Sequence, residues 1–361
     1  MSVSKPSWRV AVIGAGYFSQ FHLAGWTALP NVEVVGICDM DTAKAEAMAA
    51  RYNVAQTFGS IDELLDKARP DLVDIVTAPT SHAAILDATL ERRLATICQK
   101  PFCTDFWQAE HMAERAQGAG VPVVVHENFR FMPWFREVKR LLDQGMLGQP
   151  YSVNFRLRPG DGQGSIAYMA RQPYFQQMPR FMVKETAVHF IDTFRFLFGE
   201  VSGVYARLRR LNPVIKGEDA AIICLEFPDN TIGQFDGNRL VDHVCENPRR
   251  TMGEMWLEGS AGVLRLDGYA RLWFKPHGQT EVEHVYDRGS EVEFGGGACG
   301  RLQAHVIDAL EKGHRPENTA SDYLANLLVQ EAVYHSHLNG CRVDMATFRP
   351  SRDLASTSLF G

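Results

Sequence analysis

Val10-Ala11-Val12-Ile13-Gly14-Ala15-Gly16-Tyr17-Phe18-Ser19 is the stretch that decides the fold of this 361-residue chain. A short apolar run followed by a Gly-x-Gly turn is typical of a buried parallel strand that turns into a helix. Gly14 permits the tight turn, and Gly16 lets backbone N–H groups approach a pyrophosphate at the helix N-terminus. Ser19 stands where the fingerprint has Gly or Ala, a change that helix–strand packing tolerates. The stretch therefore predicts a dinucleotide-binding turn.

A second apolar run, residues 32–38, ends at Asp39. A carboxylate at this point can accept hydrogen bonds from both ribose hydroxyls of an adenosine. A 2′-phosphate on the same ribose would meet the negative charge of Asp39. The sequence therefore predicts NAD as the cofactor and makes NADP less favourable.

The composition limits the class of protein. The length suggests two domains, and 45% hydrophobic with 22% charged residues is typical of a soluble globular chain. A net charge of −6 without a basic block gives no electrostatic support for binding nucleic acid or an anionic membrane. Seven cysteines without a C-x-x-C pair suggest reduced thiols. Residues 1–7 lack the apolar core of a signal peptide, and no run approaches membrane-spanning length. We expect a cytoplasmic protein.

Strand-like and helix-like segments alternate in the first third of the chain. Strands are predicted at 9–13, 32–38, 72–76, 94–98 and 121–125, and helices at 42–52, 61–67, 82–91 and 105–117. This alternation predicts a doubly wound parallel sheet with its ligand at the carboxyl ends of the strands. We assign residues 1–127 to an NAD-binding Rossmann domain of the α/β class.

The rhythm changes after residue 127, because strands now follow one another without helices between them. Helices are predicted at 134–144, 184–198, 299–312 and 320–339, and strands at 151–158, 201–211, 219–227, 230–237, 252–258, 263–267, 270–275 and 281–286. We assign residues 128–361 to an α+β domain with a large, mostly antiparallel open sheet, for substrate binding and oligomerisation. A sheet face without helical cover is either polar or packs on another subunit, and we expect the latter.

Lys100 follows the fourth predicted strand, in Cys98-Gln99-Lys100-Pro101. A lysine at the carboxyl end of such a strand points toward the place where nicotinamide would lie. Its ammonium can donate to a substrate hydroxyl and exchange a proton during hydride transfer. Most lysines are simply solvated, but this context favours a catalytic role. The loop 77–82 should cover the ribose and pyrophosphate, and it also reads as a strand-to-helix turn with Thr80 or Ser81 as the N-cap.

Glu185, His189 and Asp192 are spaced i, i+4, i+7 and would share one face of a helix. In the functional interpretation Glu185 holds His189, and His189 contacts a substrate hydroxyl and relays its proton. The structural alternative is a capped helix with a buried, hydrogen-bonded histidine. Glu185 and His189 could also ligate a metal, but no third ligand at a recognisable spacing supports a zinc site, so we expect none.

These motifs together resemble one known family. The turn Gly14-Ala15-Gly16, Thr77-Ala78-Pro79 with His82, Lys100-Pro101, Asn128-Phe129-Arg130 and Glu185-x-x-x-His189-x-x-Asp192 come in the order found in the glucose–fructose oxidoreductase, inositol dehydrogenase and rhizopine-catabolism (Gfo/Idh/MocA) family. The resemblance covers nearly the whole chain. It implies a Rossmann domain, an α+β domain whose open sheet forms homodimer or homotetramer contacts, and reversible NAD(P)-dependent oxidation of a sugar or polyol hydroxyl.

The resemblance also implies roles for single residues. Lys100, His189 and Glu185 are the expected catalytic residues, although Glu185 stands where members usually have Asp, and Gln99 stands where they usually have Glu. The expected cofactor contacts are Gly14, Gly16, Tyr17, Phe18, Ser19, Asp39, Met40, Thr77, Ala78, Pro79, Thr80, His82, Gln99, Lys100 and Asn128. The expected substrate contacts are Lys100, Arg130, Arg158, Asp161, Tyr174, Glu185, His189 and Asp192.

We therefore predict an NAD-dependent dehydrogenase that oxidises a hydroxyl of a small sugar, inositol or polyol, with Lys100 and His189 handling the proton. One alternative is a catalytically silent NAD(H)-binding regulatory protein, which would not need Lys100 and His189 for proton transfer. Another is a reductase of a non-sugar carbonyl or imine, because a fold does not determine a substrate. The long irregular segment 159–182 is either a wall of the substrate site or a subunit contact.

Overall fold

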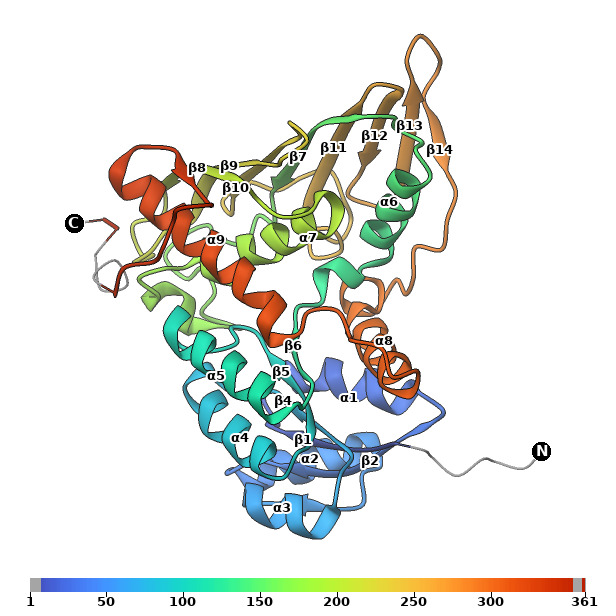
Figure 1. Cartoon of the computed structure of the whole chain (residues 1–361), viewed down its shortest axis with the longest axis vertical. Helices are drawn as coiled ribbons and strands as arrows, with labels where there is room; N and C mark the ends of the chain where they lie inside the picture. The colour runs from blue at the N-terminus through green and yellow to red at the C-terminus, as the bar shows by residue number, and fades with distance from the viewer. Residues whose placement is uncertain (1–7, 353–358, 361) are drawn as a thin grey trace. The chain divides into compact units, whose positions relative to one another are not determined.

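The computed structural model describes residues 8–352 and 359–360 and divides into two units (Figure 1). The first unit contains residues 8–128 and 297–324, and the second contains 129–296 and the described residues from 325 onward. This division differs from the predicted one at Asn128 and, more extensively, at the segment 297–324, which the prediction placed in the second domain. It joins the first unit because its helix packs closely on the first helix, where Gly25 and Gly300 let the two backbones approach.

The first unit holds a six-stranded sheet in the order β3-β2-β1-β4-β5-β6, and every pair in it is parallel. The strands are β1 (Trp8–Ile13), β2 (Val32–Cys38), β3 (Thr57–Phe58), β4 (Leu72–Ile75), β5 (Ala95–Gln99) and β6 (Val123–His126). This order is that of a dinucleotide-binding Rossmann sheet and confirms the predicted fold class. The sequence did not show β3, because two residues leave no periodic pattern.

All but the last of the helices of the first unit connect these strands, and the last comes from the segment 297–324. They are α1 (Ser19–Ala28), α2 (Thr42–Tyr52), α3 (Ile61–Ala68), α4 (Pro79–Glu91), α5 (Phe106–Ala119) and α8 (Ala298–Glu311). Helix α4 begins three residues earlier than predicted. Pro79 occupies its first position and Ala78 is its N-cap, so neither Thr80 nor Ser81 caps it.

The second unit is built on a nine-stranded sheet in the order β14-β13-β12-β11-β7-β10-β9-β8-β15. Its strands are β7 (Pro150–Leu157), β8 (Gly203–Arg209), β9 (Ala220–Glu226), β10 (Ile232–Asn238), β11 (Gly253–Gly259), β12 (Gly262–Leu266), β13 (Leu272–Pro276), β14 (Val282–His284) and β15 (Val343–Asp344). The neighbouring strands are antiparallel except β7 and β10, which are parallel. The long crossover between these two strands, which includes a helix, permits that pairing.

The longer helices of the second unit are α6 (Pro133–Asp143), α7 (Val188–Phe198) and most of α9 (Ala320–Asn339). Short helical turns lie at η1 (Phe129–Phe131), η2 (Pro173–Gln177), η3 (Val183–Ala187) and η4 (Phe294–Gly296). The predicted continuous helix over 184–198 is wrong at its start, because η3 is a π-helix that precedes α7. Such π segments are rare and frequently lie at functional sites.

One face of the second sheet is covered and the other is open. Helices α6, α7 and α9 lie along the same side of the sheet (Figure 1). Phe190 of α7 stacks on Phe155 of β7 at 4.0 Å between ring centroids, and this aromatic core fixes the position of α7. On the opposite face Tyr205, Ile232 and Trp256 are each 40–45% exposed, as expected for a face without helical cover. In the described part of the chain, no helix combines the length and apolar character needed to cross a membrane.

Candidate functional site

The turn after β1 fits a dinucleotide pyrophosphate. Gly14 has a φ of 107°, and a Cβ on it would lie 2.4 Å from the carbonyl oxygen of Val76, so the position requires glycine. A Cβ on Gly16 would meet no atom within 4 Å, because the space beside it is open. The backbone therefore leaves an exposed cradle next to the start of α1, where the positive end of the helix dipole favours an anion.

Asp39 lies directly after β2 and braces this turn. Its Oδ2 accepts a hydrogen bond from the backbone N–H of Ala15 at 2.8 Å, and its Oδ1 accepts one from Asp41 at 2.9 Å. A carboxylate has further acceptor positions, so these bonds leave room for ribose hydroxyls. The structure thus brings together the glycine turn and the carboxylate that the sequence placed at the adenosine ribose.

The remaining predicted residues of this turn divide into two groups. Tyr17 is 47% exposed and Met40 is 95% exposed, so both offer apolar surface to a cofactor. Ser19 is fully buried and donates a hydrogen bond to the carbonyl of Gly16 at 2.6 Å, while the Phe18 ring packs against His22. Ser19 and Phe18 therefore support the turn from behind.

The loop between β4 and α4 carries the next predicted cofactor residues. Ala78 and Thr80 are exposed, and the Thr77 hydroxyl accepts a hydrogen bond from Ser81. His82 is fully buried, and its two ring nitrogens lie 3.0 and 3.1 Å from the carbonyl oxygens of Phe102 and Thr77. Burial lowers the pKa of this imidazole. His82 therefore holds the loop in place, and its predicted contact with the cofactor stays a prediction.

Lys100 directly follows β5 and is partly exposed. Its backbone N–H donates to Oε1 of Gln99 at 2.6 Å. Asn128 ends the first stretch of the same unit, and its side-chain amide contacts Cys299 Sγ of α8 at 3.3 Å. The contact with α8 had no signal in the sequence, because 171 residues separate the two positions.

In the second unit His189 occupies the second residue of α7. Its ring is 5% exposed and stacks on Phe129 at 3.9 Å with an interplanar angle of 5°. The Thr193 hydroxyl donates to the carbonyl of His189, one turn along the helix. The stack on Phe129 holds the plane of the imidazole, which a proton-transferring group requires.

Arg130 and Asp192, both predicted to contact substrate, bind each other. Arg130 donates to both oxygens of Asp192 at 2.7 and 2.6 Å, and Asn326 donates to Oδ1 of Asp192 at 2.6 Å. The Asp192 side chain is fully buried. We therefore assign Asp192 to holding Arg130 and η1, next to the stacked ring of Phe129. The predicted contact of Asp192 with substrate stays a prediction.

Glu185 lies in the π-helix, whereas His189 lies in α7. The i, i+4 spacing of a regular α-helix, which predicted that the two side chains share a face, therefore does not apply between them. Tyr174 of η2 is half-exposed and accepts a hydrogen bond from Gln172. Burial raises the pKa of Tyr174 to about 12, and the nearby Glu185 carboxylate contributes to that increase. The structure thus brings Tyr174 of the 159–182 segment into electrostatic reach of Glu185.

The 159–182 segment is ordered by a residue that the sequence did not reveal. Arg239 is 2% exposed, and its guanidinium donates to both oxygens of Asp161, to the Tyr168 hydroxyl and to the Thr186 hydroxyl. Asp161 is thereby used for structure, and Arg239 ties the segment to the π-helix. The signal in the sequence was an arginine at the end of a strand, which is too common to indicate a role.

Arg158, the other predicted substrate residue, lies just after β7. It binds the Asp236 carboxylate at 2.5 Å and the carbonyl oxygens of Leu157 and Asp236. Its charge is therefore compensated within the sheet. Arg158 thus joins β7 and β10, and its predicted contact with substrate hydroxyls stays a prediction.

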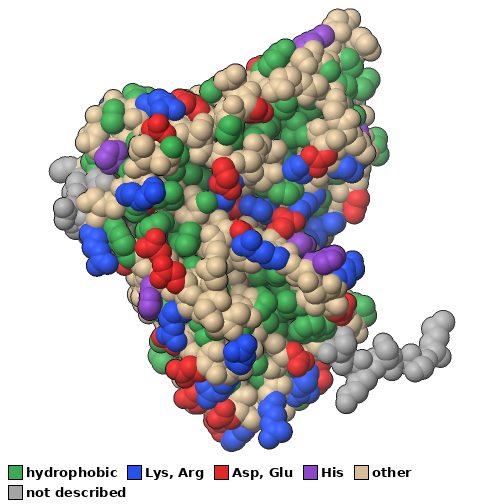
Figure 2. Space-filling model, viewed as in Figure 1, with side chains coloured by type: hydrophobic (Ala, Val, Ile, Leu, Met, Phe, Trp, Pro, Cys, Tyr) green, Lys and Arg blue, Asp and Glu red, His purple; other side chains and the backbone are tan. Residues whose placement is uncertain are grey.

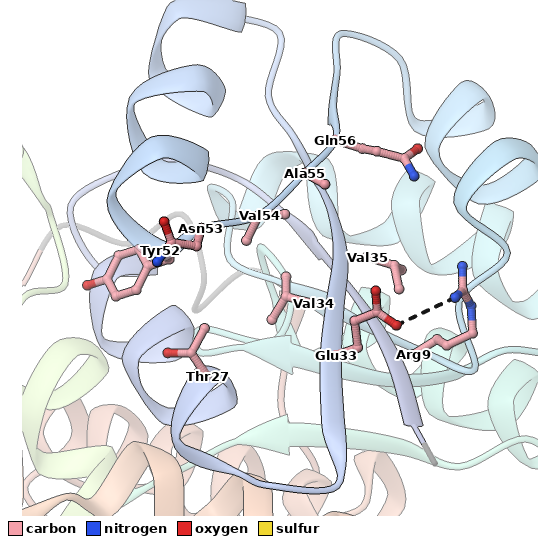
Figure 3. A pocket seen from close by; sticks show the side chains of 10 residues that line it. All are labelled: Arg9, Thr27, Glu33, Val34, Val35, Tyr52, Asn53, Val54, Ala55 and Gln56. Carbon is pink, nitrogen blue, oxygen red and sulfur yellow. Dashed lines mark ion pairs between the residues drawn. The ribbon is translucent and has the colours of Figure 1, made fainter. Parts of the chain in front are cut away.

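Other kinds of site find little support in the described residues. Acidic and basic side chains are interspersed on the visible face (Figure 2), which shows no broad basic surface for nucleic acid. A pocket of about 210 Å³ in the first unit lies along β2 (Figure 3), with Arg9 and Glu33 paired at 3.8 Å on its wall. It contains none of the predicted site residues. Among residues 8–352 and 359–360, no group of three or more His, Cys, Asp or Glu is arranged to hold a metal.

Comparisons with known proteins find relatives of both domains. A family model described as an oxidoreductase family with an NAD-binding Rossmann fold matches residues 8–127, and the Gfo/Idh/MocA C-terminal domain matches residues 135–265. D-apiose dehydrogenase of Paraburkholderia graminis is 29% identical over 358 residues, covering 97% of this chain and 93% of that protein. NAD-dependent scyllo-inositol 2-dehydrogenase of Bacillus subtilis is 25% identical over 353 residues, covering 93% and 96%.

A solved structure with the same fold is an oxidoreductase from Agrobacterium radiobacter in complex with NAD+, L-tartaric acid and magnesium. It superposes with a TM-score of 0.84 at 27% identity, over 94% of this chain and 99% of that one. Both domains of the chain therefore have counterparts in a protein whose crystals contain NAD+.

Proposed function

Because the chain belongs to the Gfo/Idh/MocA family of oxidoreductases, whose N-terminal domain is an NAD-binding Rossmann fold, we propose that it is a sugar or polyol dehydrogenase. The observation that carries this proposal is the similarity to D-apiose dehydrogenase over 97% of the chain. The open cradle at Gly16 and the Asp39 carboxylate support NAD as the cofactor. Among the sugars and polyols, a small aldose of the size of apiose is the first candidate substrate.

In the proposed mechanism, side chains of this protein handle the proton of the substrate hydroxyl. NAD+ at the Gly14–Gly16 turn supplies the acceptor for a hydride from the substrate carbon. The Lys100 ammonium hydrogen-bonds the substrate hydroxyl oxygen and stabilises negative charge on it, and His189 takes or returns the proton. The ring stack on Phe129 supports this role, since it leaves the imidazole in one plane. Glu185 and the half-exposed Tyr174 supply polar groups for the other substrate hydroxyls.

The assembly and location form part of the same proposal. We place the enzyme in the cytoplasm as a homodimer or homotetramer formed through the open face of the second sheet. The exposed side chains of Tyr205, Ile232 and Trp256 support this, because apolar surface on a sheet face is usually covered in an assembly.

The test is a substrate panel. Purified protein is incubated with NAD+ and, separately, with apiose, other pentoses, hexoses, inositols and acyclic polyols, and NADH formation is followed by absorbance. We expect turnover with at least one aldose or polyol and a higher kcat/KM with NAD+ than with NADP+. NAD+ binding measured by calorimetry without turnover on any member of the panel would contradict the proposal and favour a regulatory protein.

Replacing Asp39 tests the cofactor assignment. In Asp39→Ala, we expect the Kd for NAD+ to increase by roughly 10- to 100-fold, because a hydrogen bond to a charged group contributes about 1.5–3 kcal/mol. The preference for NAD+ over NADP+ should also shrink, since the repulsion of a 2′-phosphate is removed.

Asp39→Asn separates these two effects. It keeps an acceptor for the Ala15 N–H while removing the charge, so NADP+ should gain relative to NAD+ with a smaller loss of NAD+ affinity. Asp143→Ala on α6, an exposed aspartate, is the matched control and should change neither value. An unaltered cofactor preference in both Asp39 variants would show that Asp39 only braces the turn.

A further inference from the structure

A chain of buried hydrogen bonds leads to Lys100 within the first unit. Asp74 in the middle of β4 binds Nδ1 of His22 on α1, at 2.8 Å from Oδ2. Nε2 of the same imidazole lies 3.1 Å from the side-chain nitrogen of Gln99, at the end of β5. Oε1 of Gln99 then accepts the backbone N–H of Lys100 at 2.6 Å. Asp74 and His22 are fully buried, and Gln99 is 8% exposed.

The donors and acceptors of this chain have one consistent arrangement. The backbone N–H of Lys100 is a donor, so it requires the carbonyl oxygen of the Gln99 amide. The amide NH2 is thereby turned toward His22 and requires an acceptor at Nε2. The proton of a neutral imidazole must then be on Nδ1, where it is donated to Asp74. A glutamine at position 99 therefore selects neutral His22 with one defined tautomer.

The surroundings prevent the imidazole from leaving this arrangement. The Trp26 indole N–H donates to the same Oδ2 of Asp74 at 2.6 Å, so the buried carboxylate receives two donors. The ring of His126 on β6 stacks on His22 at 3.9 Å, and Gln303 on α8 donates to the His22 carbonyl. The titratable groups that face His22 are thus Asp74 from β4 and His126 from β6, while α8 offers a neutral amide.

We propose that Asp74, His22 and Gln99 are positioning residues for Lys100, and that the Gln99 amide holds His22 as the neutral Nδ1–H tautomer. The chain fixes the backbone at position 100 and with it the direction in which the lysine side chain leaves the strand. The effect of this hydrogen-bonded chain on catalysis rests on the proposed role of Lys100. The hydrogen-bond arrangement itself is independent of that role and is measured separately.

Replacing Gln99 by glutamate keeps the acceptor for the Lys100 N–H but puts an acceptor in place of the donor that faces His22. In Gln99→Glu a carboxylate oxygen still accepts the Lys100 N–H, but a second oxygen now faces Nε2 of His22. Two acceptors in contact are unfavourable, so the introduced carboxylate and the His22 imidazole together bind one additional proton, whichever atom carries it. This pair of groups loses the proton as the pH rises through its apparent pKa. Catalysis in Gln99→Glu should therefore fall at high pH through an ionisation that the unaltered protein lacks.

The experiment combines nuclear magnetic resonance with kinetics on the full chain. Nitrogen-15 chemical shifts of His22, assigned with His22→Gln, report its protonation in the unaltered protein, in Gln99→Glu and in Gln99→Met. We expect neutral His22 with Nδ1–H in the unaltered protein, and an additional shared proton in Gln99→Glu at neutral pH. Gln99→Met removes both links, and we expect kcat to fall by about 10- to 100-fold with little change in the KM for NAD+. Gln117→Glu, the same change on the exposed face of α5, should match the unaltered protein.

The results of this experiment can be distinguished from those of the substrate panel that tests the proposed function. A doubly protonated His22 in the unaltered protein, or a neutral His22 that carries its proton on Nε2, overturns the arrangement even if no substrate is found. If the unaltered protein is an active dehydrogenase and Gln99→Met retains its kcat, the positioning role is overturned while the enzyme function stands. Circular dichroism of each variant verifies that the fold is retained before either comparison is made.

Discussion

Lys100→Met should lower kcat by about 10²- to 10⁴-fold, the range expected when a positioned proton-transfer group is lost. Methionine keeps the length and much of the volume of the side chain but has neither charge nor donor. The backbone N–H of residue 100 still reaches Gln99, so the strand end is unchanged. The Kd for NAD+, measured by calorimetry, should remain nearly the same, because the glycine turn and Asp39 lie on other strands.

Two comparisons make this result specific. Lys312→Met, at the exposed C-cap of α8 where Lys312 pairs with Asp308, removes the same charge and should leave kcat unchanged. Lys100→Arg retains a cation with a different shape and with no readily lost proton, so it should remain strongly impaired. Near-normal turnover in Lys100→Met would remove Lys100 from the proposed mechanism.

His189→Asn should also lower kcat by about 10²- to 10⁴-fold, because it removes the group proposed to take the substrate proton. The histidine is buried against Phe129, so loss of the ring could also disturb packing. His189→Phe addresses this directly. It keeps an aromatic ring for the stack and removes both nitrogens.

A purely structural histidine predicts a different pattern. In that case His189→Phe would retain activity, whereas only His189→Asn would lose stability and turnover. We expect both variants to lose kcat, and His189→Phe to keep a melting temperature close to that of the unaltered protein. His111→Asn, on the exposed face of α5, is the matched control and should be silent in both measurements.

Much of the first unit could be predicted from the sequence because its signals are local. The strand, the Gly14 turn and the carboxylate at Asp39 lie within one βαβ segment, and each has a steric or electrostatic reason to be there. The π-helix at 183–187 could not be predicted in this way. Its residues form an acceptable α-helical pattern, and the tie between Thr186 and Arg239 joins positions 53 residues apart.

The roles of the site residues also divide into those with a local signal in the sequence and those set by distant contacts. Asp192 was predicted to contact substrate from its spacing to Glu185 and His189, yet both of its oxygens bind Arg130, 62 residues away. Asp74 carried a readable signal, since a charged residue inside the apolar run Leu72–Ile75 requires a partner. The identity of that partner, His22, could not be read from the chain.

The sequence alone determined the fold class and the dinucleotide turn and predicted NAD as the cofactor, because strand periodicity, glycine geometry and the end of a strand act over a few neighbouring residues. Only the tertiary structure decided that α8 joins the first unit, that β7 pairs in parallel with β10, and that His22 links Asp74 to Gln99. These contacts join residues far apart in the chain. Their partners are selected by packing and by the need to satisfy buried donors and acceptors, which no local pattern records.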